Sequence, residues 1–164
     1  MIIEPFDQTR HPVVEITDLL HRAYATLLSM GLKFWATHQP PETTLERLLA
    51  GSGFVALHEG RIVGTITYYD KGEGTNCDWY QSPGVCRFGQ FAVEPGLQKT
   101  GIGSALLETV AQLAKSSGKR ELALDTSEQA DHLIGYYQKK GFRFVQHLQW
   151  HGVNYRSVVL SKTL

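Results

Sequence analysis

A strand, a glycine-containing turn and a helix follow one another in the middle of the chain, and this order constrains the fold more than any other feature. Residues 85–93 (VCRFGQFAV) form a strand-like run that Glu94-Pro95-Gly96 ends. From Gly101 onward apolar residues recur at helical spacing until Gly118. A short apolar run at 121–125 then supplies a second strand. A strand–helix–strand unit of this kind predicts a sheet that contains parallel neighbours.

The other segments add hairpins and further helices around this unit. We expect a helix at 13–30, a short helix ending at Leu49 and capped by Thr43 or Thr44, and a helix at 130–140 that Gly141 closes. The expected strands are 2–6, the hairpin 54–58 and 62–69, and the hairpin 143–150 and 153–160 around His151-Gly152; residues 70–84 are expected to form a loop.

This succession predicts an α+β fold with one mixed, mostly antiparallel sheet of about seven strands and helices on both faces. With 164 residues, of which 42% are hydrophobic, the chain is expected to form one domain over residues 1–164.

The charge balance and the apolar pattern exclude several classes of partner. Sixteen basic residues face sixteen acidic ones, so no global basic field favours nucleic acid or an anionic membrane. Neither a secretory signal nor an apolar run of about 18 residues is present, so we expect a cytoplasmic protein without membrane insertion. Cys77, Cys86 and the seven histidines lack zinc-site spacing, and we expect no metal.

The glycine turn can bind an anion through its backbone. A helix N-terminus offers unpaired N–H groups and a partial positive charge, which together favour phosphate, although a glycine-rich helix start without a ligand stays an alternative. A P-loop requires Lys-Ser/Thr after its last glycine, whereas Ile102-Gly103 follows Gly101. A dinucleotide motif would need a third glycine at Leu106; only Asp125, at the distance of a ribose-binding acid, keeps that alternative open.

Two segments resemble the signature of the GNAT acetyltransferase superfamily, in the family's order. The first is Gln98-Lys99-Thr100-Gly101-Ile102-Gly103, which follows the pattern Gln/Arg-x-x-Gly-x-Gly/Ala after a strand. The second is Tyr137-Gln138-Lys139-Lys140-Gly141-Phe142, which is similar to Tyr-x-Lys-x-Gly-Phe. The resemblance covers about residues 85–145 in sequence. It implies an N-acetyltransferase that uses acetyl-CoA as co-substrate, with a V-shaped split between two parallel strands ending near Val93 and Asp125.

The resemblance also implies where the cofactor binds. In such enzymes the strand end would offer backbone groups to pantetheine, which here assigns Phe91, Ala92 and Val93. The turn would hold the pyrophosphate through its backbone, which assigns Gln98, Lys99, Thr100, Gly101, Ile102, Gly103 and Ser104. The Lys99 side chain could add a salt-sensitive contact or remain in solvent.

Tyr137 is the expected general acid, because the resemblance places it beside the thioester and a phenol stays protonated at neutral pH. Tyr136 is its neighbour on the helix and should point elsewhere. The general base is left open. The strand carries no acid, Gln90 could only orient a water, and Asp70, Glu73, Asp78 and His151 are loop candidates.

The acceptor should enter opposite the cofactor, among aromatic side chains with few fixed charges. These are Tyr24, Phe34, Trp35, Tyr69, Trp79, Tyr80, Trp150, His151 and Tyr155. A small-molecule amine is the expected acceptor, with a protein or peptide amine as a variant. A non-catalytic acyl-CoA-binding or sensing domain and a nucleotide-binding module are the alternatives, and the family resemblance also allows a homodimer through the final strands.

Overall fold

The structure, a computed structural model that describes residues 1–71 and 76–164, is built on one sheet with the order β1-β2-β3-β4-β5-β7-β6. Among these residues the strands are β1 (Ile2–Pro5), β2 (Ser52–His58), β3 (Arg61–Tyr69), β4 (Val85–Val93), β5 (Glu121–Ser127), β6 (Arg143–Leu148) and β7 (Ser157–Thr163). Of the strand pairs in the described residues, only β4–β5 is parallel. The predicted mixed, mostly antiparallel sheet is therefore confirmed.

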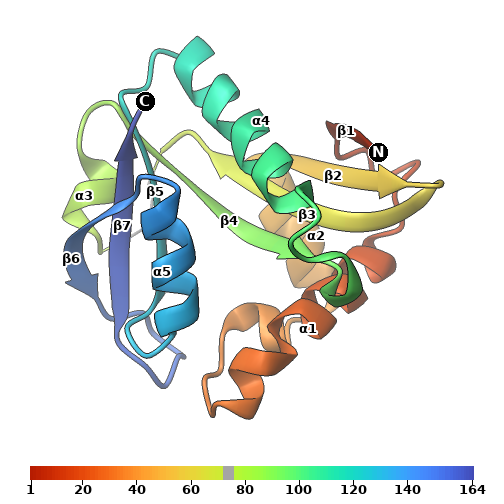
Figure 1. Cartoon of the computed structure of the whole chain (residues 1–164), viewed down its shortest axis with the longest axis horizontal. Helices are drawn as coiled ribbons and strands as arrows, with labels where there is room; N and C mark the ends of the chain where they lie inside the picture. Colours follow the sequence, from red (N-terminus) through yellow and green to blue (C-terminus); the bar gives the residue numbers. More distant parts are fainter. Residues whose placement is uncertain (72–75) are drawn as a thin grey trace.

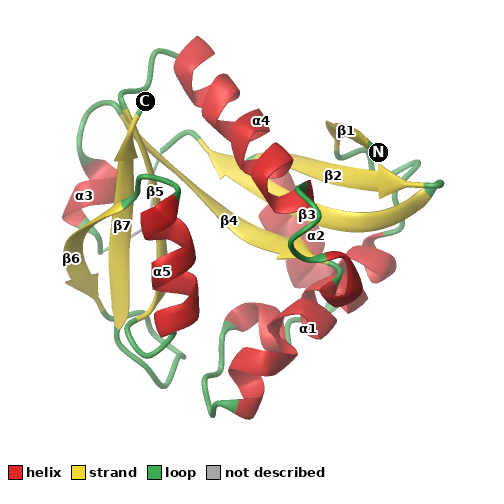
Figure 2. Ribbon diagram, in the orientation of Figure 1, coloured by secondary structure: helices red, strands yellow, loops and turns green. Residues whose placement is uncertain are grey.

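The helices cover both faces of this sheet, as predicted (Figure 2). They are α1 (Val13–Ser29), α2 (Pro41–Leu49), α3 (Asp78–Gln81), α4 (Ile102–Ser116) and α5 (Asp131–Lys139), with single 3-10 turns η1 (Trp35–Thr37) and η2 (Pro95–Leu97). α4 and α5 contribute to the core on one face, where Leu106 and Val110 are fully buried. α1 and α2 contribute Ile16 and Leu48 to the core on the other face.

Close packing of α4 explains a glycine inside a strand. A Cβ at Gly64 on β3 would stand only 2.9 Å from Cδ1 of Leu106. The missing side chain therefore lets α4 approach the sheet closely enough to bury Leu106 completely. Full burial of a leucine contributes about 1.5–3 kcal/mol relative to leaving it exposed. This packing holds the N-terminus of α4 at the end of β4.

The parallel pair opens into a V shortly after it begins (Figure 1). β4 and β5 pair only over Val85–Arg87 and Glu121–Ala123, although β4 continues to Val93. A register shift in the β3–β4 pairing and a positive φ of 48° at Gln90 mark a bulge in β4. Because a bulge bends its strand, it helps turn the second half of β4 away from β5. The split implied by the family resemblance is present.

The expected threonine cap of α2 is wrong. α2 begins at Pro41, after Pro40, and no side chain caps it. Proline is favourable at the first helical position, because its missing N–H would have no helical partner there. The Thr44 hydroxyl instead lies in the buried interior, where it accepts hydrogen bonds from Thr17 Oγ1 and Gln39 Nε2, both at 2.8 Å. The Thr44 side chain, which was expected to cap α2, therefore makes tertiary contacts instead.

The expected final hairpin is confirmed as the antiparallel pair of β6 and β7, but its tight turn around His151-Gly152 is wrong. β6 ends at Leu148 and β7 begins only at Ser157, so eight residues connect them. This connection is held by distant partners: Asn154 accepts from the Lys33 N–H (2.9 Å) and donates to Gly31 O (2.7 Å). The expected loop at 70–84 contains the short helix α3, and Glu73 lies outside the described residues.

Candidate active site

The glycine turn presents backbone N–H groups at the start of α4. Lys99 and Gly101 have positive φ angles of 65° and 96°, and the first hydrogen bond of the helix joins Ala105 N–H to Gly101 O (3.0 Å). The amides of Ile102, Gly103 and Ser104 precede this bond, so they have no acceptor within the helix. The turn can therefore receive an anion through the backbone alone.

Gly103 is the more confined of the two glycines in the turn. A Cβ at this position would stand 3.3 Å from both Phe91 Cζ and Tyr136 Oη. Gly101, in contrast, would have nothing within 4 Å of a Cβ, and its constraint is the left-handed backbone. The local structure thus explains why each of these two positions of the predicted motif is a glycine. Gln98, Lys99 and Thr100 are exposed, and the Thr100 hydroxyl donates to Leu97 O.

A lysine outside the turn points at the first turn of α4. Lys140, at the end of α5, donates from Nζ to Ser104 Oγ at 2.6 Å and lies 5.6 Å from the centre of the Tyr136 ring. Lys99, for which a phosphate contact and a solvated position were both open, is exposed in the turn itself. Lys140 therefore places a second positive charge beside the N–H groups of the helix.

The edge of β4 that faces β5 is unpaired beyond Arg87 in the described part of the chain. Ala92 and Val93 pair on the other side with Thr65 and Gly64 of β3. The Phe91 carbonyl accepts the Tyr24 hydroxyl at 3.2 Å. An extended chain laid into the split would therefore meet backbone groups of β4, and the assignment of Phe91, Ala92 and Val93 to cofactor binding stays a prediction.

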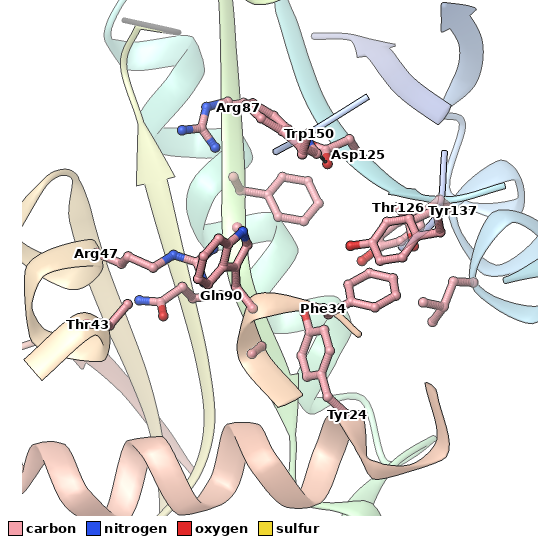
Figure 3. Close-up of a pocket in the computed structure, with 16 residues that line it drawn as sticks. Tyr24, Phe34, Thr43, Arg47, Arg87, Gln90, Asp125, Thr126, Tyr137 and Trp150 are labelled. Carbon is pink, nitrogen blue, oxygen red and sulfur yellow. Dashed lines mark hydrogen bonds between the residues drawn. The ribbon is translucent and has the colours of Figure 1, made fainter. Parts of the chain in front are cut away.

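A cavity of about 440 Å³ opens where the two strands diverge (Figure 3). β4 and β5 form its floor, and α1, η1, α2, α5 and the β6–β7 connection form its walls. The lining residues are Tyr24, Phe34, Trp35, Ala36, Thr43, Arg47, Arg87, Phe88, Gly89, Gln90, Asp125, Thr126, Leu133, Tyr137, Trp150 and Tyr155.

Tyr137 lines this cavity and Tyr136 does not. The Tyr137 side chain is buried, with 7% exposed, and its hydroxyl has no hydrogen-bond partner in the described residues. Burial, followed by the neighbouring Tyr24, Tyr136 and Asp125, raises its pKa well above the usual value of 10. Tyr136 instead lies against Gly103. The two neighbours therefore face different parts of the site, as helical geometry predicts.

Of the nine residues expected around the acceptor, five line the cavity: Tyr24, Phe34, Trp35, Trp150 and Tyr155. Tyr69, Trp79, Tyr80 and His151 do not. Two of these, Tyr69 and Tyr80, instead flank Arg87, whose guanidinium carbon lies 4.3 Å and 5.4 Å from their ring centres.

The expectation of few fixed charges is wrong, because Arg47, Arg87 and Asp125 all line the cavity. None of them is among the residues expected there, although Arg87 is the one charged residue in the run 85–93, which is a usable signal. Arg47 gives no such signal, since an arginine in a helix is most often a solvated one. Asp125 is bound on both oxygens, by the Tyr80 hydroxyl (2.6 Å) and by Trp150 Nε1 (2.7 Å).

The loop candidates for a general base do not reach the cavity. Asp70 lies 3.2 Å from Lys119 Nζ and accepts from the Tyr68 hydroxyl, while Asp78 and His151 are exposed. None of these three lines the cavity.

Gln90 lines the cavity, but its side chain is only 2% exposed and its amide already makes two hydrogen bonds, so a role in orienting a water stays a prediction. Its oxygen accepts from Gln39 Nε2 (2.6 Å), and its nitrogen donates to Thr44 O (3.3 Å).

Two further features bear on the possible chemistry. In the described residues, no group of three or more His, Cys, Asp or Glu side chains is arranged to hold a metal ion. In the same part of the chain, no helix has the length and apolar character needed to cross a membrane.

Comparison with known proteins connects this geometry to a family. The family model described as the acetyltransferase (GNAT) family matches residues 14–142. S-(2-succino)cysteine N-acetyltransferase of Bacillus subtilis (strain 168) is 29% identical over 133 residues, which are 78% of this chain and 76% of that protein.

Solved structures share the fold. One is a GNAT family acetyltransferase from Elizabethkingia anophelis with acetyl-CoA bound (TM-score 0.67, 21% identity, 99% of this chain and 97% of that one). Another is an aminoglycoside 6'-N-acetyltransferase complexed with coenzyme A (TM-score 0.68, 19% identity, 99% and 97%). At these identities the likeness establishes the architecture and leaves the acceptor open.

Proposed function

Since the chain belongs to the GNAT acetyltransferase family and thus uses acetyl-CoA, we propose that it acetylates the primary amine of a small molecule. The observation that carries this proposal is the cavity at the split of β4 and β5, which holds the free hydroxyl of Tyr137. Its volume of about 440 Å³ suits a small ligand. The similar S-(2-succino)cysteine N-acetyltransferase supports an amino-acid-like acceptor.

The described residues fit acetyl-CoA on structural grounds. The free amides at the start of α4 and the confined Gly103 form a cradle that a side chain would fill, and the edge of β4 is open to an extended ligand. In this proposal, the pyrophosphate binds to backbone groups of residues 98–104, and Phe91, Ala92 and Val93 contact the pantetheine arm. When bound, acetyl-CoA supplies an acetyl group activated as a thioester.

Tyr137 donates the proton in the proposed reaction. Its hydroxyl faces the cavity without a partner, and its raised pKa keeps it protonated at neutral pH. It would give its proton to the departing thiolate sulfur, which leaves as the thiol. The attacking amine must be neutral. After the new N–C bond forms, its proton passes to solvent, from which the Tyr137 oxygen is protonated again. Among the described residues that line the cavity, Asp125 is the only carboxylate, and each of its oxygens already accepts a hydrogen bond.

Ligand-induced stabilisation tests the cofactor, and thiol release tests the reaction. Acetyl-CoA or CoA at 100 times its Kd should stabilise the protein by about 2.7 kcal/mol in a thermal-shift assay, whereas ATP and NAD should have no effect. CoA release is then measured across a panel of small amines and peptide N-termini. Binding of acetyl-CoA without release on any amine would contradict the enzymatic proposal and favour a non-catalytic acyl-CoA sensor. Faster release on peptides than on every small amine would contradict the small-molecule acceptor.

A further inference from the structure

Two arginines from different elements line one side of the cavity. Arg47 comes from α2 and Arg87 from β4. Figure 3 shows both on the side away from Tyr137 and Thr126. Among the described residues that line the cavity, Asp125 is the only carboxylate, so positive charge exceeds negative charge there. This excess is local, because the whole chain has a formal net charge of zero.

Arg87 has no ionic partner within the described residues. Its guanidinium lies over the Tyr69 ring at 4.3 Å and near the Tyr80 ring at 5.4 Å. Its Nε is buried and has no hydrogen-bond acceptor. Aromatic faces attract the positive charge of a guanidinium. They do not replace a carboxylate, whose oxygens accept hydrogen bonds from the five N–H donors of the group. A buried donor without an acceptor is costly, and a bound anion would remove that cost.

Arg47 is held beside the same stretch of β4. Its Nη1 donates to Gln39 Oε1 at 2.6 Å, and its Nη2 would lie 3.8 Å from a Cβ at Gly89. Arg87 and Gly89 are two residues apart on one strand, so they share a face of the sheet. A Cβ at Gly89 would also lie 3.4 Å from Cε2 of Tyr69, so this glycine lets the Tyr69 ring and the Arg47 guanidinium lie close to β4.

The residues around Arg47 are polar and neutral. Gln39 binds both Arg47 and Gln90, and Gln90 also donates to Thr44 O. Tyr69 connects the pair, because its hydroxyl donates to the backbone oxygen of Arg47 (2.9 Å) while its ring supports Arg87. This network holds both arginines in place, and it gives neither of them an ion-pair partner among the described residues.

We propose that the acceptor carries a carboxylate that binds to Arg47 and Arg87, while its amine points toward Tyr137. This rests on the proposed acetylation of a small amine and specifies its chemical class. A planar carboxylate matches the fork of a guanidinium. A carboxylate also fits better than a doubly charged phosphate, because the negative charge of Asp125 near Arg87 would repel the second charge of the phosphate. Asp125 is near Arg87 since it accepts a hydrogen bond from Tyr80, whose ring neighbours Arg87.

A binding experiment tests the anion site without catalysis. CoA-saturated protein is titrated with succinate and with succinamide, its neutral counterpart, by calorimetry. We expect succinate to bind and succinamide to bind at least about tenfold more weakly, as charged hydrogen bonds require. Arg47→Met and Arg87→Met should each weaken succinate binding about tenfold or more. Arg61→Met, at the exposed start of β3 remote from the cavity, is the matched control and should bind like the wild type.

Equal binding of succinate and succinamide, or succinate binding that survives both cavity variants, would overturn the carboxylate site. Tighter binding of inorganic phosphate than of succinate would overturn the choice of carboxylate. The melting temperature of each variant is measured first. Arg47→Lys and Arg87→Lys provide folded alternatives if a methionine variant is unstable, and they should recover part of the affinity because the charge is kept and the fork is lost.

Kinetics with matched amines tests whether the site serves the reaction. Free amino acids are compared with their amides, whose amines are less basic and hence more often neutral. A preference for the acids therefore cannot come from amine basicity. We expect kcat/KM for the acids to fall about tenfold or more in each arginine variant, and kcat/KM for the amides to change less than about threefold.

The two proposals fail in different ways. Turnover of amides and acids alike, unaffected by the arginine variants, would sink the carboxylate proposal and leave the acetyltransferase intact. Binding of acetyl-CoA and of succinate without transfer to any amine would overturn the enzymatic proposal instead. In that case the arginine pair would remain an anion site without a reaction.

Discussion

The glycine turn and the acceptor cavity are built in opposite ways. The turn lies within seven consecutive residues, 98–104, and offers backbone groups whose positions follow from two glycines and a helix start. The cavity is assembled from side chains on β4, β5, α1, α2, α5 and two connections, which tertiary packing brings together. A ligand that all members of a family share can be bound by local backbone. A ligand that varies requires side chains from several elements.

The largest expected effect comes from the cavity side. Tyr137→Phe should lower kcat for acetyl transfer by about 100-fold, the lower end of what a general acid usually contributes. The Kd for acetyl-CoA should change little. The matched control is Tyr136→Phe, which loses a hydroxyl next to Gly103 rather than in the cavity. The control should change cofactor binding more than kcat. Equal kcat values for Tyr137→Phe and the wild type would remove the acid role.

The pH dependence sharpens the same assignment. Burial raises the pKa of Tyr137 well above 10. Because a general acid must be protonated to act, deprotonation of Tyr137 should lower the activity of the enzyme only above pH 10. Between pH 7 and 10 the rate with the wild type should rise, because more of the acceptor amine is neutral. Initial rates measured at several pH values between 7 and 10 check whether the rate rises. A decrease near pH 8 would indicate a different essential acid.

The next effect concerns the turn. Gly101→Ala forces a residue with a Cβ into the left-handed conformation at φ 96°, which costs about 1–2 kcal/mol. We expect about a tenfold weaker Kd for acetyl-CoA, measured by calorimetry, because the strained turn relaxes and its amides turn away. Gly96→Ala is the control: it also has open space around a Cβ, and its φ is not positive. Equal losses in both variants would show that the effect is not specific to the turn.

A smaller effect should follow when negative charge is introduced into the cavity. Gln90→Glu puts a carboxylate into the network of Gln39 and Arg47, where it would compete with the carboxylate of the acceptor. We expect KM for an amino-acid acceptor to rise about fivefold with kcat nearly unchanged, a fraction of the effect of losing a charged hydrogen bond. Steady-state kinetics with the same acid and amide pairs checks this. A rise in kcat would point instead to a role as base.

The smallest expected effect belongs to Lys140. Lys140→Met removes a cation whose Nζ lies 2.6 Å from Ser104 Oγ, at the first turn of α4. The Kd for acetyl-CoA should increase about two- to threefold at low salt, and this difference should shrink as salt is added, since exposed charges are screened. Lys99→Met is the comparison, because Lys99 is exposed in the turn. A salt-independent loss would mean that Lys140 acts through packing.

The strand and helix boundaries near the turn could be predicted closely, because each ends at glycine or proline. β4 has the expected bounds, and α4 begins one residue after Gly101. The start of α2 and the length of the connection between β6 and β7 could not be predicted. Thr44 and the connection between β6 and β7 find partners that are far away in the sequence, such as Thr17 and Gly31, and these contacts override local preferences.

The difference has one physical cause. Features that depend on neighbours along the chain could be predicted from the residues: the mixed sheet with its crossover helix, the glycine turn, and the helix face that turns Tyr137 away from Tyr136. Features that depend on distant residues became visible only in the folded chain. Arg47 and Arg87 are forty positions apart, and Tyr69 connects them, because its ring lies under the Arg87 guanidinium and its hydroxyl donates to the backbone oxygen of Arg47. The anion site proposed above rests on that arrangement.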